Sequence, residues 1–199
     1  MNMAPYEDIF KIRHNDLAPE KGKILISEPF LRNIFFQRSV ILLIEHTENG
    51  SMGFVLNKKT DLWLNDFIVG LENIPHIPIY LGGPVSADRL FFLHSLSDVI
   101  PDSIQVDDDL YCDGDFESLS YYLMSGKPVA GKIKFFLGYS GWTENQLVEE
   151  INQDSWLVGK STNRQIMYAE DEIFWKQAVK SVGGPYLNWI NYPKDPLLN

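Results

Sequence analysis

Short runs of hydrophobic residues, bounded by turn-forming residues, dominate the first third of the chain. Residues 23–27 read as a strand that ends at Glu28-Pro29, because proline disfavours helix in the residue before it. Residues 39–45 are almost wholly apolar, which predicts a strand covered on both faces. An Asn-Gly turn at residues 48–51 then predicts a hairpin, with residues 52–56 returning as the partner strand.

Helical spacing of apolar residues appears twice in the middle of the chain. Residues 62–71 carry leucine, phenylalanine and isoleucine side chains three and four positions apart, which predicts a helix. Residues 116–124 show the same spacing, and Gly126 is suited to the end of that helix because glycine readily adopts a left-handed conformation.

Two further helices are predicted in the last third. Thr143 and Gln146 have the spacing of a capping box, so a helix is expected from Thr143 to about residue 153. Residues 171–182 place apolar side chains on one stripe, and the pair Gly183-Gly184 is expected to stop that helix.

Strands and helices alternate without a strict strand–helix–strand rhythm. Further short strands are predicted at residues 79–81, 90–93, 109–112, 133–137 and 156–158. The fold class is therefore a mixed α/β, α+β-like single compact domain, with a mixed β-sheet, an early antiparallel hairpin and helices packed on the sheet. Residues 1–21 read as a polar lead-in with room for a short helix, and residues 22–199 as the single domain.

Composition narrows the classes of function. The net charge is −10 and there is no long basic run, so nucleic acid is an unfavourable partner. The first residues lack the features of a secretory signal, and the longest apolar run is far below the ~18–20 residues of a membrane span. Cys112 is the single cysteine, which excludes an intrachain disulfide and a multi-cysteine metal site. We therefore expect a cytoplasmic protein with no membrane partner, no metal and no cofactor.

Candidate catalytic groups do not form a recognisable set. The segment Gly138-Tyr139-Ser140-Gly141-Trp142 resembles a nucleophile elbow, but Trp142 stands where G-x-S-x-G requires glycine, so a tight turn is the better interpretation. His46 and His94 each follow an apolar strand and could act as a base or a ligand. Neither lies in a metal-binding spacing, and a histidine hydrogen-bonded to backbone at a strand end is the alternative.

A second group of candidates surrounds a glycine pair. Gly82 and Gly83 follow a predicted strand, where backbone N–H groups could face an anion. Arg38 and Arg89 could supply positive charge beside them, and Asn57 ends the preceding strand. No phosphate-binding glycine motif is present, so a sharp turn with surface or ion-paired arginines remains the alternative.

Several segments, taken in order, resemble the YqgE/AlgH family over residues 22–187. They are GKILISEP at residues 22–29, RSVILLIEH at 38–46, GFVLN at 53–57, LGGPV at 81–85, LFFLH at 90–94, LGYSGW at 137–142, QLVEEI at 146–151 and SWL at 155–157. The resemblance implies a compact bacterial α/β domain. The family is usually described as uncharacterised or as a transcriptional regulator, a description that comes from the genetics of alginate control, and no catalytic residues can be carried over from it.

The leading hypothesis is a non-enzymatic binding or regulatory protein that recognises a small molecule or a protein partner. Its site would lie among Arg38, His46, Asn57, Gly82, Gly83, Arg89 and His94. The alternatives are a small hydrolase that uses His46 or His94, and a regulator that binds DNA directly, which the acidic charge disfavours. Aromatic residues near the end of the chain, such as Trp189 and Tyr192, make a homodimer an open option.

Overall fold

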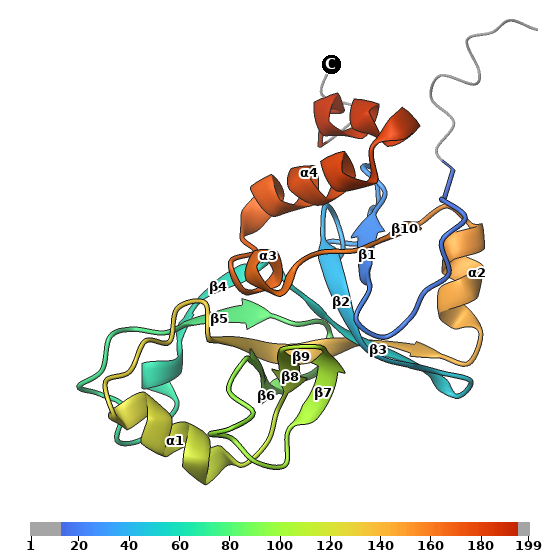
Figure 1. Cartoon of the computed structure of the whole chain (residues 1–199). Helices are drawn as coiled ribbons and strands as arrows, with labels where there is room; N and C mark the ends of the chain where they lie inside the picture. Colours follow the sequence, from blue (N-terminus) through green and yellow to red (C-terminus); the bar gives the residue numbers. More distant parts are fainter. Residues whose placement is uncertain (1–12, 195–199) are drawn as a thin grey trace, which may run out of the picture.

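The computed structural model describes residues 13–194 and contains ten strands in one sheet (Figure 1). The strands are β1 (Ile24–Ser27), β2 (Val40–Thr47), β3 (Gly50–Val55), β4 (Lys59–Trp63), β5 (Pro78–Leu81), β6 (Val85–His94), β7 (Ile104–Asp107), β8 (Leu110–Cys112), β9 (Ile133–Thr143) and β10 (Trp156–Gly159). The helices are α1 (Phe116–Met124), α2 (Gln146–Asn152), α3 (Asn163–Met167) and α4 (Asp171–Val182), with 3₁₀ segments η1 (Leu64–Asp66) and η2 (Gly184–Asn191).

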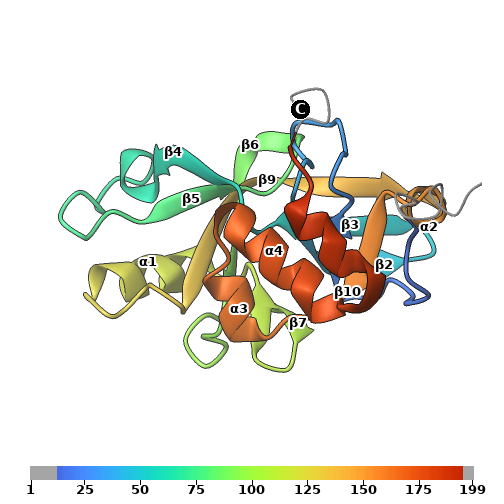
Figure 2. The same ribbon diagram turned by 90° about the horizontal axis from the view of Figure 1, so that it is seen from above.

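Strand β9 joins the two halves of the sheet. The main strand order is β10-β1-β2-β3-β9-β6-β8-β7, and β5 pairs with β9 and with β4 outside that path. The first part of β9 lies between β5 and β6, whereas residues 140–143 pair with β3. The change of neighbours follows Gly138, which has a φ of +65°. Figures 1 and 2 show β9 running through the middle of the molecule.

The sheet is covered on both faces. On one face, α4 and η2 pack Phe174, Trp175 and Trp189 against β1, β2 and β3. On the other, α2 covers the end that holds β10 and β1, and α1 covers the end that holds the start of β9. Successive residues of one strand therefore enter different cores, as Ile24 and Leu25 do. Within residues 13–194, no helix is long and apolar enough to cross a membrane.

The predicted fold class and the hairpin are confirmed. Strands β2 and β3 pair antiparallel across the Asn-Gly turn, and most other neighbours are antiparallel. The pair β5–β9 is parallel, which makes the sheet mixed. The sequence pattern did not predict β4, β7 and α3. Strands β4 and β7 are short and largely exposed, and α3 is a helix of five residues.

The predicted helix at residues 62–71 is wrong. This region contains the end of β4 and the 3₁₀ turn η1, and Gly70 has a φ of +94°. The side chain of Asn65 explains why the loop is stable without a helix. Its amide donates to the carbonyls of Leu71 (2.8 Å) and Ile74 (3.1 Å), and its oxygen accepts from the N–H of Ile77 (3.0 Å). These bonds give partners to backbone groups of the irregular loop that neither a helix nor a strand pairs.

The predicted turn at residues 138–142 and the predicted helix start at Thr143 are also wrong. Residues 138–142 continue β9, because β3 supplies backbone partners for this segment. Helix α2 begins after Asn145, which has a φ of +60° and serves as N-cap without a side-chain bond. The side-chain oxygen of Gln146 does accept from the N–H of Thr143 (3.0 Å), which is one of the two bonds of the predicted capping box. Thr143 nevertheless lies two residues before the N-cap.

The segment before β1 covers one edge of the sheet. The Asn15 side chain donates to the carbonyl of Val158 (2.7 Å) and accepts from the same residue's N–H (2.9 Å), as a neighbouring strand would. The exposed edge of β10 is thus paired at this point. Residues 13–21 contain no helix, and the rest of the predicted lead-in, residues 1–12, lies outside the described residues.

The close contact between the β5–β6 connection and β9 gives a stability prediction. A Cβ added to Gly82 would lie 2.2 Å from the carbonyl oxygen of Gly138 and 3.1 Å from the Cβ of Phe136. Gly82→Ala should therefore lower the free energy of unfolding by about 3 kcal/mol, because backbone atoms must move apart. Urea denaturation measures this change.

Gly126→Ala is the matched control for Gly82→Ala. Gly126 has a φ of +71° but no atom within 4 Å of an added Cβ, so only backbone strain of about 1 kcal/mol is expected. Equal losses in the two variants would contradict the role assigned to the close contact.

Candidate functional site

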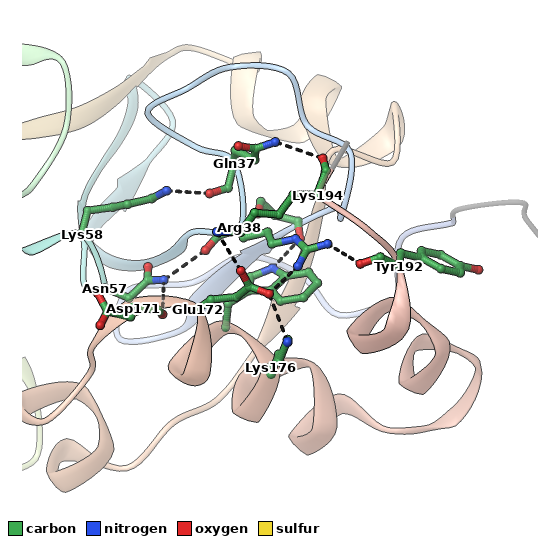
Figure 3. A network of polar contacts seen from close by, with 11 residues as sticks. Gln37, Arg38, Asn57, Lys58, Asp171, Glu172, Lys176, Tyr192 and Lys194 are labelled. Carbon is green, nitrogen blue, oxygen red and sulfur yellow. Dashed lines mark hydrogen bonds and ion pairs between the residues drawn. The ribbon is translucent and has the colours of Figure 1, made fainter. Parts of the chain in front are cut away.

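Arg38 and Asn57, two of the predicted site residues, lie together beneath the start of α4 (Figure 3). The Asn57 amide donates to the carbonyls of Arg38 (3.0 Å) and Asp171 (2.8 Å), and its oxygen accepts from the N–H of Val40 (2.9 Å). Arg38 and Asp171 both have positive φ, at 49° and 50°. The side chain of Asn57 therefore holds two strained backbone positions, one before β2 and one at the first residue of α4.

The Arg38 side chain is buried in an ionic network that connects α4 with Tyr192 and Lys194, which follow η2. Its guanidinium donates to Glu172 and to the carbonyl of Tyr192, and lies over the Trp175 ring at 5.1 Å. Glu172 also pairs with Lys176 (3.1 Å) and Lys194 (2.9 Å). Burial opposes the ionisation of Glu172, but the hydrogen bonds from Lys194, Lys176 and Arg38 outweigh it and lower its pKa to about 2.

Gly82, Gly83 and Arg89 lie near β9 but outside this network. The carbonyl of Gly82 accepts from the N–H of Val55 (2.9 Å) and the hydroxyl of Ser140 (3.1 Å). An added Cβ on Gly83 would lie 2.2 Å from the carbonyl carbon of Tyr139. Arg89 is exposed and lies over the Phe91 ring at 4.9 Å. The glycine pair thus serves close packing of backbone on backbone.

The two histidines occupy separate places in the sheet. His94 is fully buried at the end of β6, where its Nδ1 accepts from the N–H of Leu96 (3.1 Å) and its Nε2 lies 2.9 Å from the carbonyl of Asp113. Burial lowers the pKa of His94, which favours the neutral ring. His46 is half-buried near the tip of the β2–β3 hairpin, and its Nδ1 lies 2.7 Å from the hydroxyl of Ser51 on the neighbouring strand.

A different region provides a cavity. It has a volume of about 540 Å³ and lies between β5 with its preceding loop, the segment from the end of α1 to the start of β9, and the α3–α4 connection. We call it the Lys134 cavity. Its apolar lining includes Ile77, Leu123, Val129, Ile133 and Met167, and its polar lining includes His76, Tyr80, Lys127, Lys134, Tyr168 and Glu170. Concave sites of this size and character bind small molecules.

Lys134 is the unusual side chain of this cavity. It lies in β9 and is 3% exposed. Its Nζ donates to the carbonyl of Ala169 at 2.5 Å, lies 3.5 Å from that of Ile166, and stands 3.8 Å from the centre of the Tyr80 ring. Burial lowers the pKa of this amine to about 7, with the charge of Glu170 acting in the opposite direction.

Tyr80 joins Lys134 to the rim of the cavity. Its hydroxyl donates to Glu170 at 2.7 Å, and burial together with this hydrogen bond raises the pKa of the phenol well above its usual value. The sequence did contain a signal for this cluster, because Lys134 interrupts the apolar run of residues 133–137. Its partners could not be identified, since Tyr80 and Glu170 come from distant parts of the chain.

This chain is similar to known proteins over most of its length. A family model described as AlgH-like matches residues 24–187. A UPF0301 protein of Parabacteroides distasonis is 59% identical over 99% of this chain and 100% of its own length. One of Bacteroides fragilis is 46% identical over 96% of this chain and 97% of its own.

Solved structures also match the fold. The solution structure of the AlgH protein of Pseudomonas aeruginosa matches with a TM-score of 0.69 at 27% identity, over 85% of this chain and 93% of that one. A crystal structure of a Corynebacterium diphtheriae protein matches with a TM-score of 0.71 at 22% identity, over 90% and 95% of the two chains, and shows the shared fold.

The contacts of Asn57 predict a structural effect. Asn57→Ala leaves the N–H of Val40 and the carbonyls of Arg38 and Asp171 without this partner in a buried region, so unfolding should become easier by about 3 kcal/mol. Thermal and urea denaturation measure the loss. Asn49→Ala, at the exposed hairpin turn, is the control and should change stability by less than about 0.5 kcal/mol.

The lowered pKa of Glu172 predicts a dependence of stability on pH. The folded-state pKa of about 2 lies below the ordinary value of 4.5, so this carboxylate contributes stability above about pH 4.5 that is lost as the pH falls toward 2. Glu172→Gln should cost about 2 kcal/mol at pH 7 and flatten the stability curve over that interval. Urea denaturation from pH 2 to 7 tests this, with exposed Glu48→Gln as control; an unchanged slope in Glu172→Gln would contradict the network.

Proposed function

The chain belongs to the AlgH-like family, and from that premise we propose that it is a non-enzymatic binding protein whose ligand, a small and mainly apolar molecule, occupies the Lys134 cavity. Family membership assigns the fold but not an activity, so the proposal rests on the site. The observation that carries it is a concave apolar space with a single buried amine in its wall.

The construction of the cavity supports binding. Strands β5 and β9 fix the part of the wall that holds Tyr80 and Lys134, and the loop before β5, the segment after α1 and the α3–α4 connection complete it. Apolar walls favour an apolar ligand body by removing it from water. A few polar groups at one place orient the ligand, which is the usual arrangement in small-molecule sites.

A regulatory role in the cytoplasm is the second part of the proposal. One wall of the cavity is formed by Met167, Tyr168 and Glu170, immediately before α4. The next residue, Asp171, is held by Asn57, and Glu172 is held by Arg38. Ligand contact with this wall therefore bears on the position of α4 and on the surface that α4 and η2 offer to a protein partner.

The pair His46–Ser51 is the observation that favours a hydrolase as a second candidate. A histidine 2.7 Å from a serine hydroxyl could act as its base. Ser51 is only 9% exposed, however, and within residues 13–194 no carboxylate hydrogen bonds to the other nitrogen of His46. Labelling with a fluorophosphonate probe would support this candidate if Ser51→Ala abolished it. Direct DNA binding is disfavoured by the net charge of −10.

The binding proposal predicts uptake of a neutral fluorescent probe. N-phenyl-1-naphthylamine, which brightens in apolar surroundings, should bind with a dissociation constant of the order of 0.1 mM. Ala130 is exposed and lines the cavity, so Ala130→Trp should fill the entrance and weaken binding at least about tenfold. Fluorescence titration measures both values.

Ala87→Trp provides the control, because Ala87 is an exposed alanine of β6 outside the cavity lining. It should bind the probe like the unmodified protein. Equal binding by both tryptophan variants would place the probe elsewhere and contradict the cavity as the site.

A further inference from the structure

The buried amine of Lys134 has no acidic side chain paired with it among the described residues. Among residues 13–194, the ion pairs within 4.0 Å involve other lysines, one arginine and one histidine, and none includes Lys134. The groups that contact its Nζ are two backbone carbonyls and an aromatic ring, all of them uncharged. The carboxylate of Glu170 belongs to an exposed residue and accepts the hydroxyl of Tyr80 instead.

A buried ammonium group without a counter-ion is costly. An ammonium group loses its hydration when it is buried, and neutral carbonyls restore only part of that stabilisation. Two events relieve the cost: the amine loses its proton, or an anion enters the cavity beside it. The lowered pKa of Lys134 is consistent with the first event in the absence of a ligand.

We propose that the Lys134 cavity is selective for small monocarboxylates with an apolar body, and that the ligand carboxylate pairs with the ammonium group of Lys134. This inference rests on the proposed binding function and names its ligand class. The apolar walls accommodate a chain or ring, and the single buried cation accommodates one negative charge. Glu170 at the rim repels a second negative charge on the ligand.

Other titratable groups line the same cavity, and a change in their charge would also make ligand affinity depend on pH. Tyr80 comes from β5, Tyr168 and Glu170 from the α3–α4 connection, His76 from the loop before β5 and Lys127 from the segment after α1. The raised pKa of Tyr80 keeps this phenol neutral near pH 7. Histidine is the remaining type of side chain that changes charge near neutrality. The variant His76→Gln therefore separates any contribution of His76 from that of Lys134.

Binding of a carboxylate is linked to the protonation of Lys134. A carboxylate binds the charged amine better than the neutral amine, so bound ligand raises the pKa of Lys134 above its value of about 7 in the free protein. Carboxylate affinity is then greatest below pH 7 and falls as the pH rises above it, with a proton taken up on binding. An uncharged ligand of the same shape has no such dependence.

The experiment compares octanoate, octanamide and 1-octanol by isothermal titration calorimetry at pH 6.0 and pH 8.5, on the full chain. Octanoate should bind more tightly than octanamide at pH 6.0 and lose about tenfold in affinity at pH 8.5. The two uncharged compounds should change by less than about twofold. His76→Gln should retain the pattern. Lys134→Met should bind octanol as before, while losing both the preference for octanoate and its pH dependence.

The outcomes distinguish this inference from the proposed function. Equal, pH-independent binding of all three compounds would overturn the carboxylate selectivity and leave the cavity as a binding site. Loss of the pH dependence in His76→Gln would assign the effect to His76 and overturn the role of Lys134. Binding by none of the compounds, together with no uptake of the neutral probe, would overturn the binding function itself. The unmodified protein already tests the inference, so a folding defect in Lys134→Met does not remove the test.

Discussion

Pairing along β9 is the constraint on which the rest of the structure depends. The strand must hydrogen bond to β5 and β6 over its first part and to β3 over its last, and the left-handed conformation of Gly138 lets one chain follow both paths. Because Gly82 and Gly83 lack side chains, their backbone approaches β9 at this point. Helices α4, α2 and α1 then find their places through the apolar faces that this sheet presents. The Lys134 cavity is a product of the same arrangement, since β9 provides Lys134 and its parallel neighbour β5 provides Tyr80.

Buried polar groups divide into two kinds in this fold. His94 and Asn57 have their hydrogen-bonding groups matched by backbone, and the charge of Arg38 is matched by Glu172, although the buried Nε of Arg38 has no partner. These residues hold elements together. Lys134 is matched only by neutral groups, although it is as deeply buried. The lack of a charged partner, rather than the type of residue, therefore distinguishes Lys134 in the candidate site from the polar residues that hold the fold together. This division also explains why the polar residues at strand ends, which were the natural candidates in the sequence, mostly contact backbone.

The sequence predicted elements whose signals were local. The β2–β3 hairpin follows from Asn49-Gly50, and α4 from its apolar stripe and the glycines after it. Failures occurred where backbone groups found partners that the local pattern does not reveal, namely the Asn65 side chain in the loop after β4 and strand β3 beside residues 140–143. Threonine and glutamine stand three apart at Thr143 and at Thr162, yet only Thr162 forms a capping box, because Thr143 is committed to β9. The cavity could not be predicted, since its walls come from three separated parts of the chain.

The pairing of β1 with β10 has a consequence for synthesis of the protein. Ile24 in β1 pairs with Gly159 in β10, and the second edge of β3 stays uncovered until residues 140–143 of β9 have been synthesised. At about 5–20 residues per second, a ribosome needs on the order of 10 s to make the intervening chain. During that interval β1 and the apolar β2–β3 hairpin have emerged without β10 and β9, the strands that cover their outer edges. We therefore expect the nascent chain to bind chaperones at the ribosomal exit, because they cover exposed apolar segments.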